Sequence, residues 1–236
     1  RDTRAIVTRQ LGTLRLTEEG KYQMLSGAAR TPRQAEKVSG DNYVLFKNVE
    51  GQVIMSLADG MGTGRQASRE SGKIVDLTEQ LMEAGFTARS SLKLVNTVLL
   101  LAGAEQHPAA VDLLCVDLNT GVLEVMKLGA AASFVIGRDG VELLDAGDVP
   151  MGILNPVEPA LLSKKLWDDD RIVMVSDGVL DGLWGEDKEK TLKEFLEALP
   201  PSGPQEIADQ VLNFALSSGG ARDDMTVLAA GIWEKS

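Results

Sequence analysis

Two residue types that carry much of protein chemistry are almost missing from this chain of 236 residues. The one cysteine, Cys115, lies in the apolar run Val111–Val116, which excludes an internal disulfide and favours a reducing compartment. The one histidine, His107, lies beside Pro108 in an expected loop, and we expect it at the surface. One cysteine and one histidine cannot supply the usual zinc ligands, and no serine–histidine or activated cysteine nucleophile is indicated.

The chain also lacks long apolar runs and an excess of basic residues. Its longest apolar stretches, such as Val98–Ala104, are far shorter than the roughly 20 residues that span a bilayer. The formal net charge of -11 argues against an extended nucleic-acid surface. No leader peptide is visible and the chain begins at Arg1, so we expect a soluble fragment whose membrane contact comes only from a region outside these residues.

The composition predicts one large globular domain. Hydrophobic residues make up 44% of the chain and charged residues 25%, which is typical of a protein with a sizeable core. Residues 1–20 are polar and basic, and we interpret them as a linker or the lead-in to the first strand. Residues 21–236 form the expected domain, with a helical pair at about 65–103 whose members stop at Gly85 and Gly103.

The periodicity of the remaining segments predicts strands with helices grouped in pairs. Four short strands separated by turns, between 111 and 144, indicate an antiparallel meander. Two further strands, at 161–166 and 171–175, precede helices at 188–199 and from Pro204, and a last strand covers 225–232. We therefore expect an α+β fold, a two-sheet antiparallel β-sandwich flanked by helices.

Acidic residues recur at the ends of the most apolar strands. Asp59 follows the run that begins at Val53, Asp177 follows 172–176, and Asp41 precedes Tyr43–Phe46. Asp223 and Asp224 precede the last strand. Each acid taken alone is most simply a turn or a helix cap. If the strand ends converge, however, several carboxylates meet in one cleft, where divalent hard cations such as Mg²⁺ or Mn²⁺ are the usual solution.

Four segments carry a resemblance to a known family. They are Ser39-Gly40-Asp41, Asp59-Gly60-Met61-Gly62-Thr63-Gly64, Ser176-Asp177-Gly178 and Asp223-Asp224-Met225-Thr226. In this order they resemble the metal-dependent protein serine/threonine phosphatases of type 2C (the PPM superfamily), most closely the phosphatase domains of stage II sporulation protein E. The resemblance extends from about Tyr22 to Ile232.

The resemblance implies a site with two Mn²⁺ or Mg²⁺ ions at one end of the sandwich. Asp59 would bridge the metals and the Gly60 carbonyl would ligate one of them. Asp177 and Asp223 would complete the first metal, and Asp41 would serve the second directly or through water. Asp224 stands where relatives often have asparagine, so the choice of ligand between Asp223 and Asp224 stays open.

Two further roles have no assigned residue in this chain. Many type 2C enzymes have a histidine after the Asp-Gly step, a candidate proton donor, where this chain has Met61. The general acid is therefore unassigned, and metal-bound water is one candidate. Arg30 and Arg33 are candidates for the arginine that holds the phosphate in eukaryotic relatives.

The resemblance also implies a biological role. The activity would be hydrolysis of phosphoserine on a phosphorylated anti-anti-sigma factor, which would activate a sporulation sigma factor. The chain would be a cytoplasmic domain of a membrane-anchored protein at the cell membrane or division septum, with no nucleic-acid partner. The helical pair is a candidate contact surface for a homodimer. It would act either as a switch that moves Asp59 and Gly60 through a hinge at the glycines, or as a static packing layer.

Two rival functions are distinguishable. One is a catalytically inactive phosphatase fold that serves as a binding or regulatory module, which is disfavoured because all four acidic sites are present. The other is a phosphatase that uses Asp59 as a nucleophile, as haloacid-dehalogenase-type enzymes do. Those enzymes need a second aspartate two residues on, and Met61 occupies that place.

Overall fold

The computed structural model describes residues 5–10, 13–18, 20–48, 50–62, 64–102, 107–145, 149–154 and 156–235, with side chains described from residue 20 onward. Strands β1 (Ala5–Gln10) and β2 (Thr13–Glu18) pair antiparallel with each other and form a two-stranded sheet of their own. The segment interpreted from sequence as a linker therefore contains a β-hairpin.

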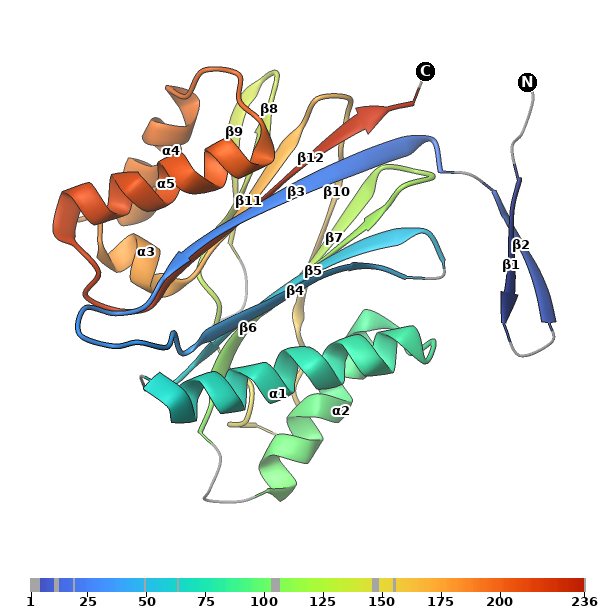
Figure 1. The fold of residues 1–236 in the computed structure, drawn as a ribbon, viewed down its shortest axis with the longest axis horizontal. Coiled ribbons are helices and arrows are strands. Elements are labelled where there is room, and N and C mark those ends of the chain that lie inside the picture. Colours follow the sequence, from blue (N-terminus) through green and yellow to red (C-terminus); the bar gives the residue numbers. More distant parts are fainter. Residues whose placement is uncertain are drawn as a thin grey trace.

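Two five-stranded antiparallel sheets build the rest of the fold (Figure 1). The first sheet has the order β10-β7-β6-β5-β4, with β4 (Asp41–Lys47), β5 (Gln52–Gly60), β6 (Ala109–Asp117), β7 (Val122–Leu128) and β10 (Ala160–Lys165). The second sheet has the order β3-β12-β11-β8-β9, with β3 (Tyr22–Thr31), β8 (Ser133–Gly137), β9 (Gly140–Leu144), β11 (Arg171–Val175) and β12 (Met225–Glu234).

Helices cover the outer face of each sheet and give four layers (Figure 1). Helices α1 (Gly64–Glu83) and α2 (Ala88–Leu101) pack on the first sheet, and α3 (Asp177–Asp181), α4 (Lys188–Glu197) and α5 (Pro204–Gly219) pack on the second. The predicted α+β sandwich is confirmed. No helix among the described residues is long and apolar enough to cross a membrane.

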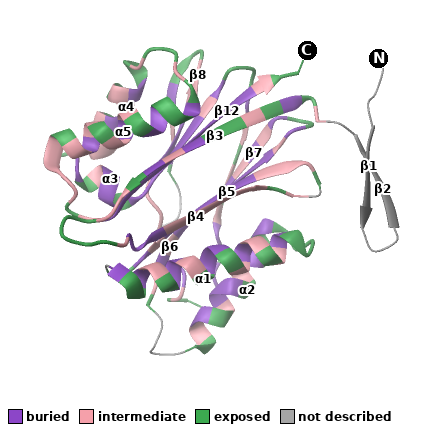
Figure 2. Ribbon diagram, in the orientation of Figure 1, coloured by how far each residue is buried: buried purple, intermediate pink, exposed green. Residues whose placement is uncertain are grey.

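The core has three apolar layers, one between the sheets and one under each helical group (Figure 2). Met55, Leu114 and Met174 are fully buried between the sheets, because alternate residues of each strand face inward. Ile54, Leu113 and Cys115 face the opposite way, under α1 and α2. Strands buried on both faces explain the continuous apolar runs of the sequence.

The predicted meander over residues 111–144 is wrong. Strands β6 and β7 belong to the first sheet, but β8 and β9 belong to the second, so the chain crosses between the sheets after Leu128. Gly129 makes this crossing with a φ of 64°, and a Cβ there would lie 2.7 Å from the Pro150 ring. An alternating pattern of hydrophobic and polar residues predicts a strand, but it does not predict which sheet the strand belongs to.

A buried ion pair of the first sheet contacts the second sheet close to this crossing. The Lys127 ammonium on β7 is fully buried and contacts the Asp112 carboxylate on β6. It also donates to the Ser133 hydroxyl on β8 at 2.9 Å and to the Ala131 carbonyl at 2.6 Å. Burial raises the pKa of Asp112, and Lys127 opposes that shift. Each charge therefore needs the other to remain in the core.

Removing one partner of this pair should destabilise the protein far more than removing both. Lys127→Met leaves the Asp112 carboxylate buried without its counter-charge, and we expect a loss of about 3–5 kcal/mol in the free energy of unfolding. The double variant Lys127→Met/Asp112→Leu should regain most of that loss. Urea unfolding measures both values, and equal losses in the single and double variants would contradict this assignment.

Candidate metal centre

Two carboxylates face each other at the open end of the first sheet. Asp41 begins β4 and Asp59 lies one residue before the end of β5, and the antiparallel register places them directly opposite each other. Residues opposite each other on adjacent strands have Cβ atoms about 4.5–5.5 Å apart. The backbone ladder therefore fixes two like charges side by side, and the strands cannot separate without losing their pairing.

The second sheet brings three more carboxylates to the same end. Asp177 opens α3 directly after β11, and Asp223 and Asp224 precede β12, which pairs with β11. Two hydrogen bonds of 2.9 Å tie these ends together, from the Ser176 amide to the Thr226 carbonyl and from the Thr226 amide to the Ser176 hydroxyl. Helix α3 itself was not anticipated from the sequence, because it has only five residues.

Gly178 allows these two segments to touch. A Cβ at this position would lie 2.1 Å from the Asp224 carbonyl oxygen and 3.2 Å from the Asp223 Cβ. The first of these distances is shorter than any that a real Cβ atom makes. The Asp-Gly step at 177–178 is therefore required by the close approach of two backbones, in addition to any chemistry of Asp177.

Asp224 and Asp223 have different surroundings. The Asp224 carboxylate is buried and accepts hydrogen bonds from the backbone amides of Arg33, at 2.8 Å, and Gly40, at 2.7 Å. It thereby anchors the segment 32–40, which leads into Asp41. Asp223 is partly exposed, and its Oδ1 accepts from the Asp224 amide at 2.8 Å. No feature of the sequence distinguished these two neighbours.

The carboxylates of both sheets affect one another's protonation. Burial raises the pKa of Asp59 to about 10, and the charges of Asp41, Asp177 and Asp223 add to the shift. Burial also raises the pKa of Asp41 to about 7, with Asp224 and Asp177 contributing in the same direction. The neighbouring hydroxyls of Thr226 and Ser176 oppose the shift of Asp41.

The pKa of Asp223 is raised as well. Burial is the main cause, and the charges of Asp177 and Asp224 add to it. The Asp224 amide and the nearby Arg33 guanidinium oppose the shift. All five predicted acidic residues therefore share one electrostatic environment, which is the convergence that the sequence analysis required.

The donor chemistry of this cluster fits a hard divalent cation. Both carboxylate oxygens of Asp41 are buried and have no hydrogen-bond partner. Burying a charged carboxylate in this way costs free energy unless another group compensates the charge. All the donors are oxygen atoms, which suits Mg²⁺ or Mn²⁺. Among the described residues, no group of three or more Asp, Glu, His or Cys side chains has the arrangement of a metal site. Binding of a cation would therefore require these side chains to move closer together.

The glycine-rich segment after Asp59 connects this cluster to α1. A Cβ on Gly60 would lie 2.7 Å from the Ala67 carbonyl, so α1 packs directly on the end of β5. Gly62 and Gly64 have φ values of 105° and 74°, which L side chains rarely adopt. The predicted hinge position thus has the backbone conformation of a glycine turn. Both roles of the helical pair, as a switch and as a static packing layer, stay predictions.

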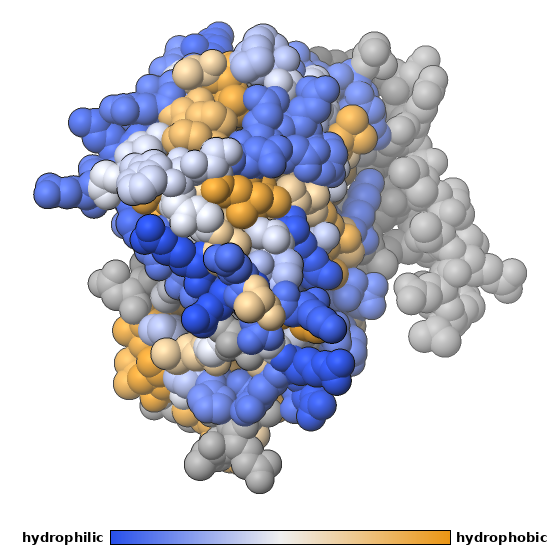
Figure 3. Space-filling view, turned by 60° about the vertical axis from the view of Figure 1, so that its left-hand side comes forward, coloured by the Kyte–Doolittle hydropathy of each residue, from blue (hydrophilic) through white to orange (hydrophobic). Residues whose placement is uncertain are grey.

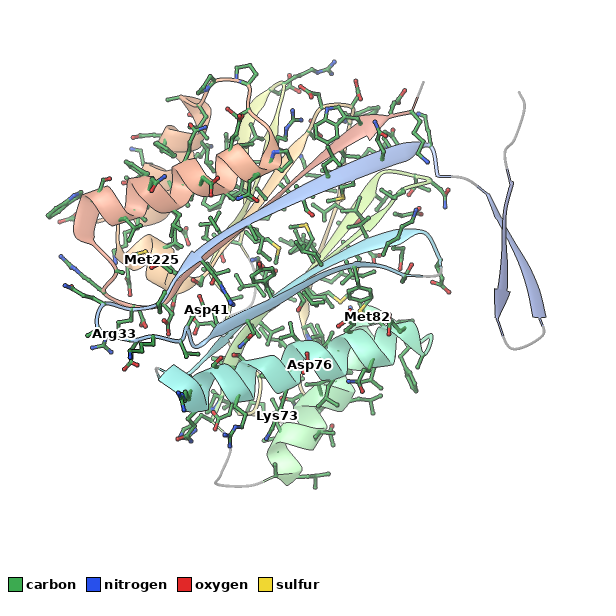
Figure 4. All side chains as sticks on the ribbon, viewed as in Figure 1. Arg33, Asp41, Lys73, Asp76, Met82 and Met225 are labelled. Carbon is green, nitrogen blue, oxygen red and sulfur yellow. The ribbon has the colours of Figure 1, made fainter. Side chains whose placement is uncertain are left out.

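His107 lies at the same end and is not an isolated surface residue. Its imidazole Nδ1 is 3.2 Å from the carboxylate of Glu70, a buried residue on α1, and half of the His107 side chain is exposed. The neighbouring Pro108 carbonyl accepts a hydrogen bond from the Met61 amide at 3.3 Å. Arg33 and Asp41 also lie at this end (Figure 4). No local pattern of residues predicts the link between His107 and Glu70, because the two residues are far apart in the chain.

Comparison with known proteins identifies the relatives of this chain. The family model of stage II sporulation protein E (SpoIIE) matches residues 49–233. Stage II sporulation protein E of Bacillus subtilis (strain 168) is 30% identical over 214 residues, covering 89% of this chain and 26% of that protein. The protein of the same name from Priestia megaterium is 30% identical over 212 residues, covering 89% and 36%. The chain thus spans only about a quarter to a third of the length of these relatives.

Solved structures agree with this relationship. The PP2C phosphatase domain of SpoIIE from Bacillus subtilis, solved with a fragment of its regulatory domain, matches with a TM-score of 0.85 at 27% identity, covering 97% of this chain and 71% of that chain. The RsbU and RsbW domains of a Mycobacterium tuberculosis protein match with a TM-score of 0.80 at 17% identity, covering 90% of this chain and 61% of that chain. The second likeness concerns the fold alone.

Replacing Asp41 should change how stability depends on pH in the presence of a chelator. The ordinary pKa of 3.8 applies to the unfolded chain, so between about pH 4 and 7 the folded state holds a proton that the unfolded state has lost. Stability should therefore fall as pH rises through this window. Asp41→Asn removes this contribution, and we expect it to be the more stable protein at pH 7.5 by on the order of 1–3 kcal/mol.

Urea unfolding of both proteins at pH 4.5 and 7.5, with chelator, measures this difference. The advantage of Asp41→Asn should be small at pH 4.5. It should disappear when saturating Mn²⁺ replaces the chelator, because the cation neutralises the Asp41 carboxylate of the wild type and the asparagine has no charge to neutralise. An advantage that is equal at both pH values would show that Asp41 does not carry the raised pKa.

Proposed function

Because the chain belongs to the stage II sporulation protein E family and is a protein serine/threonine phosphatase domain of the PP2C type, we propose that it hydrolyses phosphoserine on a protein with two bound Mn²⁺ or Mg²⁺ ions. The observation that carries this proposal is the meeting of carboxylates from both sheets at one end of the sandwich, including the unpartnered oxygens of Asp41.

The chain's own residues would hold the cations and position the substrate. Asp59, which lies opposite Asp41, would hold the cations together with Asp41, and the Gly60 carbonyl follows Asp59 directly. Asp177 and Asp223 are the proposed ligands from the second sheet. Asp224 is assigned to holding the segment 32–40, since two backbone amides already occupy its carboxylate. When bound, the two cations lower the pKa of water at the site and neutralise charge on the phosphoryl oxygens.

Two arginines are the proposed contacts for the substrate phosphate. Arg33 lies close enough to Asp223 to influence its pKa, and its side chain is exposed. Arg30 lies opposite Thr226 in the β3–β12 pair and is also exposed. A guanidinium offers planar, paired donors that match a phosphoryl group. Met61 carries no transferable proton, so the proton for the leaving serine oxygen is left to solvent at the site.

The substrate and the cellular setting are inferred from the family. We propose a phosphorylated anti-anti-sigma factor as the substrate and activation of a sporulation sigma factor as the outcome. We also propose that this chain is a cytoplasmic domain of a protein attached to the cell membrane or division septum through residues outside this sequence. The family membership of the chain supports these assignments.

Replacing a proposed ligand should abolish turnover and weaken metal binding together. Asp59→Asn and Asp177→Asn should each lower the hydrolysis of a generic aryl phosphate by at least about 100-fold, because even residues that only support metal ligands cost 10–100-fold. Both variants should also bind Mn²⁺ more weakly in calorimetry, with little loss of folded structure. Wild-type turnover should be lost in chelator and restored by Mn²⁺.

Asp139→Asn is the matched control, since Asp139 lies almost fully exposed in the turn between β8 and β9. It should keep wild-type turnover. Wild-type activity and unchanged metal dependence in Asp59→Asn would refute the assignment. Absence of turnover in the wild type under every metal tested, with Mn²⁺ binding intact, would favour the inactive binding module.

A homodimer through the helical pair stays a prediction. Leu94, Val98 and Leu101 form an exposed apolar stripe on α2, which supports contact with a second copy. Val98→Asp should lower the sedimentation coefficient at high protein concentration if this stripe is the interface. An unchanged distribution of species would contradict it.

A further inference from the structure

Some lysine and arginine side chains of this acidic protein form ion pairs with carboxylates, and others do not. Within the described residues, ten lysines and arginines form ion pairs with a carboxylate, and one of these pairs joins Lys188 to Asp181 on α3. The ten residues are Lys21, Arg89, Lys93, Lys127, Arg138, Lys164, Arg171, Lys188, Lys190 and Lys193. With 35 acidic residues against 24 basic ones, most exposed cations are expected to find a carboxylate.

Five exposed cations at the mouth of the metal centre have no carboxylate within ion-pair distance among the described residues. We call them the basic rim: Arg30, Arg33, Lys37, Arg65 and Arg222. The end of the sandwich that carries them is turned toward the viewer in Figure 3, where hydrophilic residues cover much of the surface. Arg30 lies over the Tyr43 ring at 5.9 Å and Arg222 donates to the Gly219 carbonyl at 3.3 Å, so neither charge is neutralised.

The acid cluster fixes the positions of three rim segments. The Arg33 amide donates to Asp224, and Arg222 directly precedes Asp223. The first turn of α1 approaches the segment 32–40, because a Cβ on Gly64 would lie 3.3 Å from the Glu36 carboxylate. Arg65 and Lys37 therefore lie on the two elements that meet at this contact. Glu36 is the only acid of the segment 32–40 and forms no ion pair within the described part of the chain.

We propose that the basic rim is a docking surface for acidic residues that flank the phosphoserine of the protein substrate. This inference rests on the proposed function, since it concerns the substrate of the same site. Unpaired cations around a site attract negatively charged partners and raise the rate of encounter. They also exclude basic flanks, because like charges would face each other. The rest of the surface, with its negative net charge, repels an acidic partner and directs it to this end.

Two phosphoserine peptides that differ only in their flanks, Asp and Glu in one against Asn and Gln in the other, test this proposal. Binding is measured by fluorescence anisotropy and turnover by phosphate release, each at 50 and 500 mM salt. At low salt the acidic peptide should bind and react better by on the order of tenfold, because several weak exposed charge pairs add up. The preference should nearly disappear at high salt, where exposed charges are screened.

Arg65→Glu and Lys37→Glu should each lower the preference for the acidic peptide at least about threefold at low salt. Both sites are exposed, and glutamate suits the first turn of a helix, so the variants should fold. Lys47→Glu is the matched control: Lys47 is exposed, has no ion pair within the described residues, and lies at the opposite end of β4 from Asp41. It should keep the wild-type preference.

The outcomes separate this proposal from the proposed function. Equal binding of the two peptides at low salt, or an equal loss in Lys47→Glu, would overturn the docking surface even if turnover is normal. A clear preference in binding without hydrolysis of any peptide or aryl phosphate would support the docking surface and overturn the phosphatase activity.

Discussion

Repulsion between carboxylates held at one end of two sheets is the constraint on which the site depends. Asp41 and Asp59 are opposite each other by strand register, so the backbone ladder prevents them from separating. Asp177 and Asp223 add charge from the second sheet. Burial, with added charge from the neighbouring carboxylates, raises the pKa of Asp41 and of Asp59, and a divalent cation offsets such buried charge most directly.

The surrounding structure is built to maintain this arrangement. Ser176 and Thr226 bind each other across β11 and β12, Gly178 lets the Asp224 backbone approach, and Asp224 holds the segment that leads into Asp41. The ion pair between Lys127 and Asp112 of the first sheet hydrogen-bonds with the Ser133 hydroxyl on β8, and this contact links the two sheets. Because these interactions join elements distant in sequence, the site is only as well ordered as the contact between the two sheets.

The distribution of charge separates two tasks at the same end of the protein. The buried acids attract cations, while the exposed rim of Arg30, Arg33, Lys37, Arg65 and Arg222 is available to an anionic partner. An acidic net charge elsewhere does not conflict with a phosphorylated substrate, since most distant cations are already paired. Fields around a site depend on the local arrangement of charges more than on their sum.

The sequence by itself determined the four longer helices, most of the strands and the list of acidic residues, because apolar periodicity and glycine stops are local properties. The match of four spaced motifs also predicted the two-sheet sandwich. Only the tertiary structure decided that β8 and β9 leave the first sheet, that Asp224 binds the amides of Arg33 and Gly40, and that His107 meets Glu70. These facts depend on contacts between segments far apart in the chain, and no local pattern of residues encodes which distant partner a side chain will meet.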